Sequence, residues 1–226
     1  KRAKDIEARQ QQAIQAKSGL LQKWEPLEYL KLSPLPCRGD RPLAVFSQVK
    51  VQYCGRDVCG PVSFALHPGE RVVLDGKNGS GKSSLLKVLL GESIPHSGTI
   101  TTSAGLVVSY VPQDTAHLNG LLSHFAEKHH LDESLFKGIL RKMGFERVQF
   151  EKKMEDFSAG QKKKVLLAAS LCQPAHLYVW DEPLNFVDLH TRLQITSLLR
   201  QAQPTMLFVE HDRAFQEEIA TQKISL

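Results

Sequence analysis

The chain has 226 residues, enough for one domain of ordinary size or for one domain with an appendage. Hydrophobic residues make up 42% and charged residues 23% of the sequence, a balance that excludes a disordered chain and a fibrous repeat. The longest strongly apolar stretch, residues 165–172, is far shorter than the roughly 18 residues of a bilayer span, so the sequence contains no transmembrane segment.

The N-terminal residues carry most of the excess positive charge. Residues 1–42 contain nine Lys or Arg against five Asp or Glu, whereas the remaining residues contain twenty against nineteen. Such a basic arm is typical either of a solvated, exposed helix or of a contact with an anionic partner.

Residues 1–17 are rich in good helix formers and lack Gly and Pro, which predicts a solvated helix. Pro26, Pro34 and Pro36 disrupt the apolar pattern that follows, and we place a domain boundary near residue 42. Because the sequence starts with Lys1 in what reads as the middle of a helix, we expect a fragment of a longer polypeptide.

Beyond residue 42, strand and helix patterns alternate. Strands are predicted at residues 71–75, 106–111, 177–180 and 206–209, and a mostly buried helix at residues 83–90. Residues 115–160 read as a helical insertion, in which residues 132–143 form a helix capped by Asp132, with Leu135, Ile139 and Leu140 on one side. This order predicts an α/β fold around a parallel sheet that is covered on both faces.

The four cysteines are scattered along the chain. Cys37, Cys54, Cys59 and Cys172 form no CxxC pair, lack the spacing of a zinc site and are too few for a disulfide scaffold. The N-terminus is charged and rich in Gln, unlike a signal peptide. Both features fit a protein of the reducing cytosol.

The first chemical motif follows the strand at residues 71–75. Residues 76–83 (GKNGSGKS) match G-x-x-x-x-G-K-[ST], between a strand and a helix as the motif requires. Its backbone N–H groups and the helix dipole surround a phosphate, Lys82 neutralises charge and the Ser83 hydroxyl can bind Mg²⁺. The alternative, a glycine-rich turn that happens to contain Lys, does not explain this context. The nucleotide-binding residues expected here are Gly76, Lys77, Asn78, Gly79, Ser80, Gly81, Lys82, Ser83 and Ser84.

A second motif follows the strand at residues 177–180. Asp181 and Glu182 come directly after this apolar run, so one carboxylate can hold Mg²⁺ through water and the next can polarise an attacking water. By itself an Asp-Glu pair after a strand is often a solvated turn. Together with the phosphate loop it predicts a hydrolytic phosphate site with Glu182 as the general base.

Between these motifs, residues 157–164 (FSAGQKKK) precede a helical run. Here the sequence resembles the ATP-binding-cassette (ABC) family, whose signature is close to L-S-G-G-Q. Ser158, Gly160 and Gln161 match, while Phe157 replaces Leu and Ala159 replaces the first Gly. The resemblance implies that Ser158, Ala159, Gly160 and Gln161 contact the nucleotide held by an opposing cassette. An ordinary N-capped helix is the alternative if the motif is taken alone.

Other positions match the family in the same order. Tyr53 resembles the aromatic residue that stacks on adenine, with a core tyrosine as the alternative and Phe46 as a rival. Gln113 resembles the glutamine that contacts Mg²⁺ and water, and His211 the histidine that holds the γ-phosphate and orients the catalytic carboxylate. Asp188 resembles an aspartate that communicates across the cassette dimer.

The segment after Glu182, P-L-N-F-V-D, is similar to the E-P-T-N-H-L-D region of the ABC-F branch, from which Leu184, Phe186 and Val187 depart. Several runs, among them SYVPQD and QFEKKMEDFSAGQKKKV, resemble ABC-F proteins that protect ribosomes from lincosamides, streptogramin A and pleuromutilins. The resemblance implies a twin-cassette protein whose basic linker contacts rRNA or tRNA phosphates.

The resemblance therefore implies an α/β P-loop NTPase domain of the ABC type at residues 43–226, with a mixed sheet core and a helical subdomain at about 115–172. A partial helical interdomain linker at residues 1–42 would precede it. ATP and Mg²⁺ are the implied cofactors. The implied partners are the ribosome and a second cassette, in the same full-length chain or in a homodimer, and the implied location is cytoplasmic and ribosome-associated. The alternatives are the ATPase subunit of an ABC transporter and a nucleotide-gated binding module without turnover.

Overall fold

The computed structural model describes residues 32–37, 39–53 and 56–226. The helix expected at residues 1–17 lies outside these residues, and residues 32–37 and 39–42 form no helix. This segment lies along the domain: Leu32 is buried in the core, and the N–H of Leu35 donates to the carbonyl of Ala175 at 2.8 Å. The first strand then begins at Ala44.

The strands form two sheets, which differ in the direction of strand pairing. The first is antiparallel, and its central strand β1 pairs with the other three. Its strands are β1 (Ala44–Tyr53), β2 (Arg56–Asp57), β3 (Val62–Leu66) and β5 (His96–Thr102). The second sheet is parallel throughout, in the order β6-β7-β8-β4-β9. Its strands are β4 (Arg71–Asp75), β6 (Val108–Val111), β7 (Leu177–Asp181), β8 (Met206–Val209) and β9 (Gln222–Ser225).

Except at its edge strand β9, the parallel sheet is buried on both faces, as its continuous apolar strands predict. Because side chains alternate along a strand, β4, β6, β7 and β8 each contribute to two separate cores. In β7, Leu177 and Val179 pack with the antiparallel sheet, whereas Tyr178 and Trp180 pack with the helices on the opposite face. The predicted α/β fold is thus confirmed.

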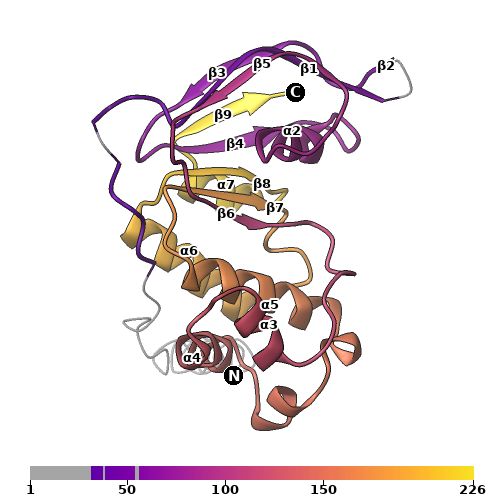
Figure 1. Cartoon of the computed structure of the whole chain (residues 1–226), viewed down its shortest axis with the longest axis vertical. Helices are drawn as coiled ribbons and strands as arrows, with labels where there is room; N and C mark the ends of the chain where they lie inside the picture. The colour runs from indigo at the N-terminus through magenta and orange to yellow at the C-terminus, as the bar shows by residue number, and fades with distance from the viewer. Residues whose placement is uncertain (1–31, 38, 54–55) are drawn as a thin grey trace, which may run out of the picture.

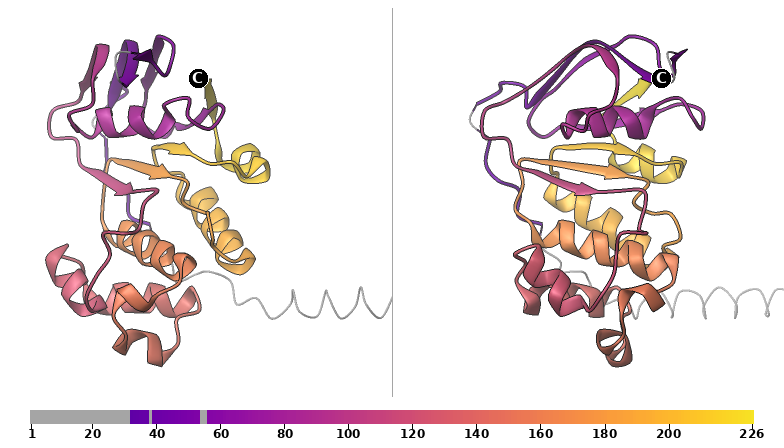
Figure 2. Two further views of the ribbon diagram at one scale, coloured as in Figure 1. Left: turned by 90° about the vertical axis from the view of Figure 1, so that its right-hand side faces the viewer. Right: turned by 45° about the vertical axis from the view of Figure 1, so that its right-hand side comes forward.

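Helices fill the spaces on either side of this sheet (Figure 1). The helices are α2 (Lys82–Leu89), α3 (Leu122–Lys128), α4 (Glu133–Lys142), α5 (Ala159–Cys172), α6 (Leu189–Ala202) and α7 (Arg213–Ile219), with two 3₁₀ turns at Arg147–Glu151 and Met154–Asp156. Leu85 and Leu86 of α2 belong to the core between the two sheets. Helices α5, α6 and α7 cover the opposite face, and α3 and α4 lie beyond α5, farthest from the antiparallel sheet (Figures 1 and 2).

Helix α4 corrects one detail of the sequence prediction. Asp132 caps the helix as predicted, because its Oδ1 accepts the N–H of Leu135 at 2.8 Å. The Leu135 side chain, however, is 44% exposed, and Phe136 takes its place beside Ile139 and Leu140 in the core. Positions 136, 139 and 140 follow the i, i+3, i+4 spacing of one helix face. Leu135 comes one residue before Phe136 and therefore lies off this face.

In the part of the chain that the structure describes, no helix combines the length and the apolar content of a bilayer span.

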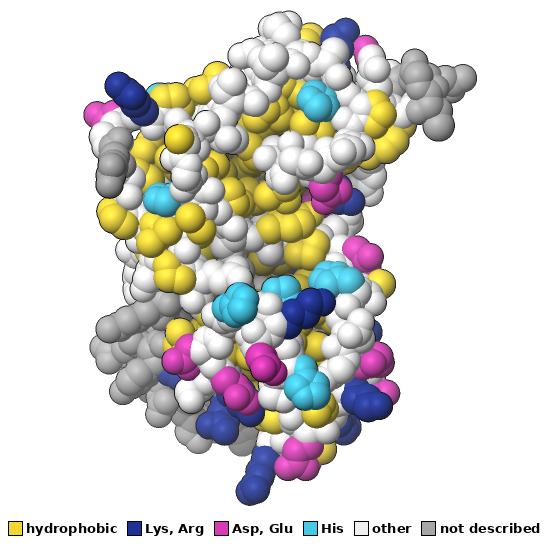
Figure 3. Space-filling model, in the orientation of Figure 1, with side chains coloured by type: hydrophobic (Ala, Val, Ile, Leu, Met, Phe, Trp, Pro, Cys, Tyr) yellow, Lys and Arg dark blue, Asp and Glu magenta, His cyan; other side chains and the backbone are white. Residues whose placement is uncertain are grey.

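Figure 3 shows hydrophobic side chains gathered over the middle of one face, around the edge strand β6, and charged and histidine side chains over the region of α3 and α4.

Candidate nucleotide-binding site

The loop between β4 and α2 has the backbone that a phosphate-binding loop requires. Gly79 and Gly81 adopt left-handed φ angles of 80° and 87°, and Gly81 is the N-cap of α2. The Lys82 ammonium closes the loop by donating to the carbonyls of Gly76 at 2.8 Å and Lys77 at 2.9 Å. The N-terminus of α2, with its positive dipole end, therefore begins where the loop ends.

Asp181 ends β7 beside this loop. The Ser83 hydroxyl donates to its Oδ1 at 3.1 Å, while its Oδ2 is buried and, among the described residues, has no hydrogen-bond partner. Burial raises the pKa of Asp181, opposed by the hydrogen bond from Ser83. A hydroxyl beside an unsatisfied carboxylate oxygen is a donor set that suits a hard cation such as Mg²⁺. The residues present therefore fit Mg²⁺.

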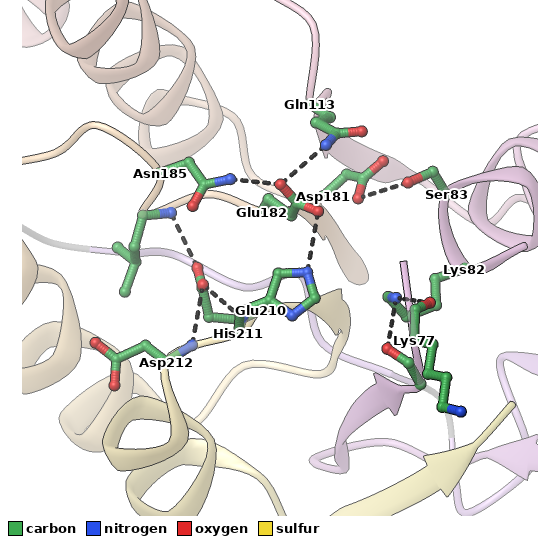
Figure 4. Close-up of polar contacts among 12 residues, drawn as sticks. Lys77, Lys82, Ser83, Gln113, Asp181, Glu182, Asn185, Glu210, His211 and Asp212 are labelled. Atoms are coloured by element: carbon green, nitrogen blue, oxygen red, sulfur yellow. Dashed lines mark hydrogen bonds and ion pairs between the residues drawn. The ribbon is translucent and has the colours of Figure 1, made fainter. Parts of the chain in front are cut away.

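Glu182 is held by three side chains, one after each of the strands β6, β7 and β8 (Figure 4). Gln113 Nε2 donates to its Oε2 at 2.9 Å, Asn185 Nδ2 donates to the same oxygen, and His211 Nε2 lies 3.3 Å from Oε1. Glu182 itself adopts a left-handed φ of 47°, an uncommon backbone conformation for a residue with a side chain. The carboxylate is thereby fixed at the meeting point of the strands β6, β7 and β8.

These segments surround a cavity of about 660 Å³. It is lined by Tyr53, Val58, Asn78, Gly79, Gly81, Lys82, Ser83, Ser84, Gln113, Glu182, Asn185 and His211. Most of the residues expected to bind nucleotide or to act on it are thus brought together, while Gly76, Lys77 and Ser80 complete the loop outside the lining. A volume of this size suits a small organic ligand.

The two aromatic candidates at the adenine position differ in burial. Tyr53 is 45% exposed, and its hydroxyl lies 2.9 Å from Ser84 Oγ at the cavity. Phe46 is buried and stacks on Phe64 with ring centroids 4.3 Å apart. Tyr53 is therefore the side chain that is available for stacking, and the reading as a core tyrosine is wrong.

The four signature residues lie at the start of α5, outside the cavity lining. Ser158 Oγ accepts the Gln161 N–H at 3.2 Å and Gln161 Oε1 accepts the Ser158 N–H at 2.9 Å, which forms a capping box. Gly160 packs so closely that an added Cβ would lie 2.4 Å from the carbonyl oxygen of Phe186. The start of this helix thus contacts the segment that follows Glu182.

Asp188 caps α6 and pairs with a lysine of α5. Its Oδ1 accepts the N–H of Thr191 at 3.0 Å, and its Oδ2 lies 2.6 Å from Lys164 Nζ. Partial burial raises its pKa, but the hydrogen bonds from Lys164 and Thr191 outweigh this effect and lower the pKa to about 2. The sequence singled out Asp188 for an intermolecular role and missed this intramolecular one.

Two residues at the site were not identified from the sequence. Asn185 reaches Glu182, and its only signal was its agreement with the Asn of the ABC-F pattern. Glu210 is 3% exposed and accepts the N–H groups of Leu184 at 3.1 Å, His211 at 2.7 Å and Asp212 at 3.3 Å. It directly follows an apolar strand, the same signal that identified Asp181 and Glu182. Its carboxylate joins the loop after Glu182 to the loop that carries His211.

The family model described as "ABC transporter" matches residues 59–185, more than half of the chain. The probable ATP-binding protein YheS of Escherichia coli K12 is 32% identical over 178 residues, which cover 76% of this chain and 28% of YheS. The ribosome protection protein VmlR of Bacillus subtilis is 30% identical over 167 residues, 72% of this chain and 30% of VmlR. The chain thus spans less than a third of either relative.

A relative of more similar length is the zinc import ATP-binding protein ZnuC of Buchnera aphidicola, 32% identical over 182 residues that cover 76% of each chain. Among solved structures, a bacterial Atm1-family ABC exporter with ATP bound superposes with a TM-score of 0.71 at 19% identity, over 86% of this chain and 38% of the exporter chain. This likeness concerns the fold.

Proposed function

Because the chain belongs to the ABC transporter family, whose ATP-binding domains are ATPases, we propose that its cavity binds and hydrolyses ATP as one cassette of an ABC-F protein that acts on the ribosome. The observation that supports the ATPase part is the convergence of Gln113 and His211 on Glu182 beside the phosphate loop.

The phosphate loop supplies the binding. Backbone N–H groups of residues 76–84 and the start of α2 face the phosphates, and the Lys82 ammonium transfers its hydrogen bonds from the loop carbonyls to phosphate oxygens. Tyr53, exposed at the rim of the cavity, stacks on the adenine ring. These contacts fix the γ-phosphate with respect to Glu182.

Hydrolysis then depends on Glu182. Its carboxylate accepts a proton from the attacking water, and the amides of Gln113 and Asn185 hold Oε2 so that Oε1 faces the water and His211. His211 contacts Oε1 and thereby orients the carboxylate, and it also contacts the γ-phosphate. Ser83, Gln113 and Asp181 would hold Mg²⁺, Asp181 through water, and the ion would neutralise phosphate charge.

A second cassette completes the site. We propose that Ser158, Ala159, Gly160 and Gln161 contact the γ-phosphate of nucleotide bound to the partner cassette, since in this chain they lie outside the cavity lining. Asp188 would take part in communication between the two cassettes. We also propose that residues 43–226 form the cassette, with a helical subdomain at about 115–172, and that residues 1–42 are part of the linker to the other cassette.

The ribosomal part of the proposal is supported by the similarity to VmlR, a ribosome protection protein, and by the charge of residues 1–42. A basic linker gains sequence-independent affinity from rRNA or tRNA phosphates. We propose a cytoplasmic, ribosome-associated protein of the group that protects against lincosamides, streptogramin A and pleuromutilins.

Sedimentation tests this proposal directly. The natural polypeptide that contains this chain, carrying Glu182→Gln, is mixed with ATP and 70S ribosomes and centrifuged through a sucrose cushion. We expect the variant to pellet with ribosomes, because nucleotide binding without hydrolysis retains the closed state. The double variant Lys82→Ala/Glu182→Gln, which lacks the phosphate contact, should stay in the supernatant.

ZnuC supports a second candidate, the ATPase subunit of a transporter. This candidate predicts that the polypeptide purifies with membrane proteins and does not pellet with ribosomes in either variant. The same preparation therefore separates the two functions. We favour the ABC-F candidate because the segment P-L-N-F-V-D keeps the Asn that contacts Glu182.

A further inference from the structure

Three consecutive lysines follow the signature residues, and the middle one is buried. Lys163 is 2% exposed, whereas Lys162 and Lys164 on either side are only partly covered. An ammonium group without hydrogen-bond acceptors is costly in a protein interior, so its position needs a compensating set of partners.

Backbone carbonyls of two other segments supply these partners. Lys163 Nζ donates to the carbonyls of Pro112 at 2.9 Å, Gln113 at 3.3 Å and Asp181 at 3.3 Å. An ammonium has three N–H donors, and three carbonyls accept them here. The first two acceptors lie just after β6, and the third ends β7.

Nearby carboxylates offset part of the cost of burying the Lys163 ammonium. Burial lowers the pKa of Lys163, and the carboxylates of Asp181 and Glu182 oppose this effect. The ammonium in turn offsets part of the negative charge that these two carboxylates bring to one place.

Lys163 lies on α5, five residues after its cap at Ser158, so a single side chain connects the signature helix to the backbone of Gln113 and of Asp181. These are two of the residues proposed to hold Mg²⁺. We infer that Lys163 is a positioning residue, which sets the places of Gln113 and Asp181 with respect to α5. The inference rests on the proposed roles of these two residues in ATP hydrolysis.

The test compares Lys163→Met with Lys137→Met in the natural polypeptide. Methionine keeps the length of the buried stem and removes the donors, while Lys137 is a partly exposed lysine of α4 that pairs with Glu133. We expect Lys163→Met to lower kcat about 10- to 100-fold and to raise the half-activating Mg²⁺ concentration about 10-fold, the usual range for the loss of a partner that orients a metal ligand. The affinity for ATP without Mg²⁺ should stay within about 2-fold, because the phosphate loop is untouched.

A second readout needs no turnover. Amide hydrogen exchange in residues 111–116 of the nucleotide-free protein should become faster in Lys163→Met, with no change in α4. If the substitution only reduced the amount of folded protein, fewer molecules would be active, but the half-activating Mg²⁺ concentration would not change. If Lys163→Met does not fold, Lys163→Gln, which keeps two donors, is measured in its place and should show a smaller shift in the same direction.

Unchanged kcat, Mg²⁺ requirement and exchange in the folded variant would overturn the inference. Lys82→Ala is measured in parallel to separate this outcome from a failure of the proposed site. If Lys82→Ala loses ATP while Lys163→Met behaves like Lys137→Met, the site stands and the positioning role falls. If Lys82→Ala keeps its ATP affinity, the proposed site itself is wrong.

Discussion

The carboxylate of Glu182 is held on both oxygens, and we propose that this position makes it the general base. Replacement by Gln preserves the size of the side chain and removes the group that takes the proton. We expect Glu182→Gln to reduce ATP hydrolysis about 100- to 10,000-fold, the usual contribution of a general base, with little change in ATP affinity. Single-turnover hydrolysis and equilibrium binding of ATP measure the two effects separately. Unchanged hydrolysis would remove Glu182 from the role of base.

Glu210 differs from Glu182, because its carboxylate accepts backbone N–H groups of neighbouring loops. Its two oxygens accept three N–H groups, and an amide in its place would offer one acceptor and turn an NH₂ group toward the remaining donors. We expect Glu210→Gln to lower the free energy of unfolding by about 1–3 kcal/mol, the cost of unpaired buried donors. Urea unfolding measures this loss. A variant as stable as the parent would show that the contacts of Glu210 contribute nothing to the fold.

The residues that line the candidate site could largely be predicted, since the motifs specify residue types at fixed spacing beside strand ends. What the sequence does not contain is the direction of a side chain in space. Glu210 and Lys163 both follow recognisable motifs, but only the packing of β8 against β7, and of α5 against β6, reveals which backbone groups they meet. Phe46 and Tyr53 were likewise separated only by their burial.

Among the elements, α6 depends on its cap at Asp188. The pKa of this carboxyl falls from an ordinary value of 3.8 to about 2, so the ionised form is favoured by folding. The stabilisation is therefore present above about pH 4 and is lost as the pH falls through about 2. Because half of the side chain is exposed, solvent screening reduces the contribution to about 1 kcal/mol.

Asp188→Asn tests this contribution, since Asn still caps the helix but cannot pair with Lys164. We expect the variant to be about 1 kcal/mol less stable at pH 7, with the difference from the parent shrinking between pH 4 and pH 2. Denaturant unfolding at several pH values provides the measurement. A difference that stays constant across this range would assign the effect to the cap instead of the charge.

The strands and helices with strong patterns were predicted closely, because their apolar residues repeat at the spacing of the element. Strands β4 and β8 have the predicted limits, and α2 agrees within one residue. The antiparallel sheet was not predicted strand by strand, since β5 is mostly exposed and carries no apolar alternation. Its pairing with β1 arises from contacts that are distant in sequence, which local patterns do not encode.

For the molecule as a whole, the proposal that two cassettes together form each ATP site has a simple kinetic consequence. The isolated 226-residue chain should hydrolyse ATP slowly, and its activity per molecule should rise with protein concentration as pairs form. Turnover measured over a wide concentration range, beside the molecular mass in solution, tests this expectation. Rapid turnover by a confirmed monomer, independent of concentration, would contradict the need for a second signature.

The strand order also determines when the site forms. Strand β4 leads into the phosphate loop, yet its two neighbours in the sheet, β8 and β9, come much later in the sequence. Pairings between such distant segments form slowly, because the intervening chain must first be ordered. The ability to bind ATP should therefore be acquired late in folding. ATP added to a refolding reaction would then stabilise the finished molecule by mass action and leave the rate of folding unchanged.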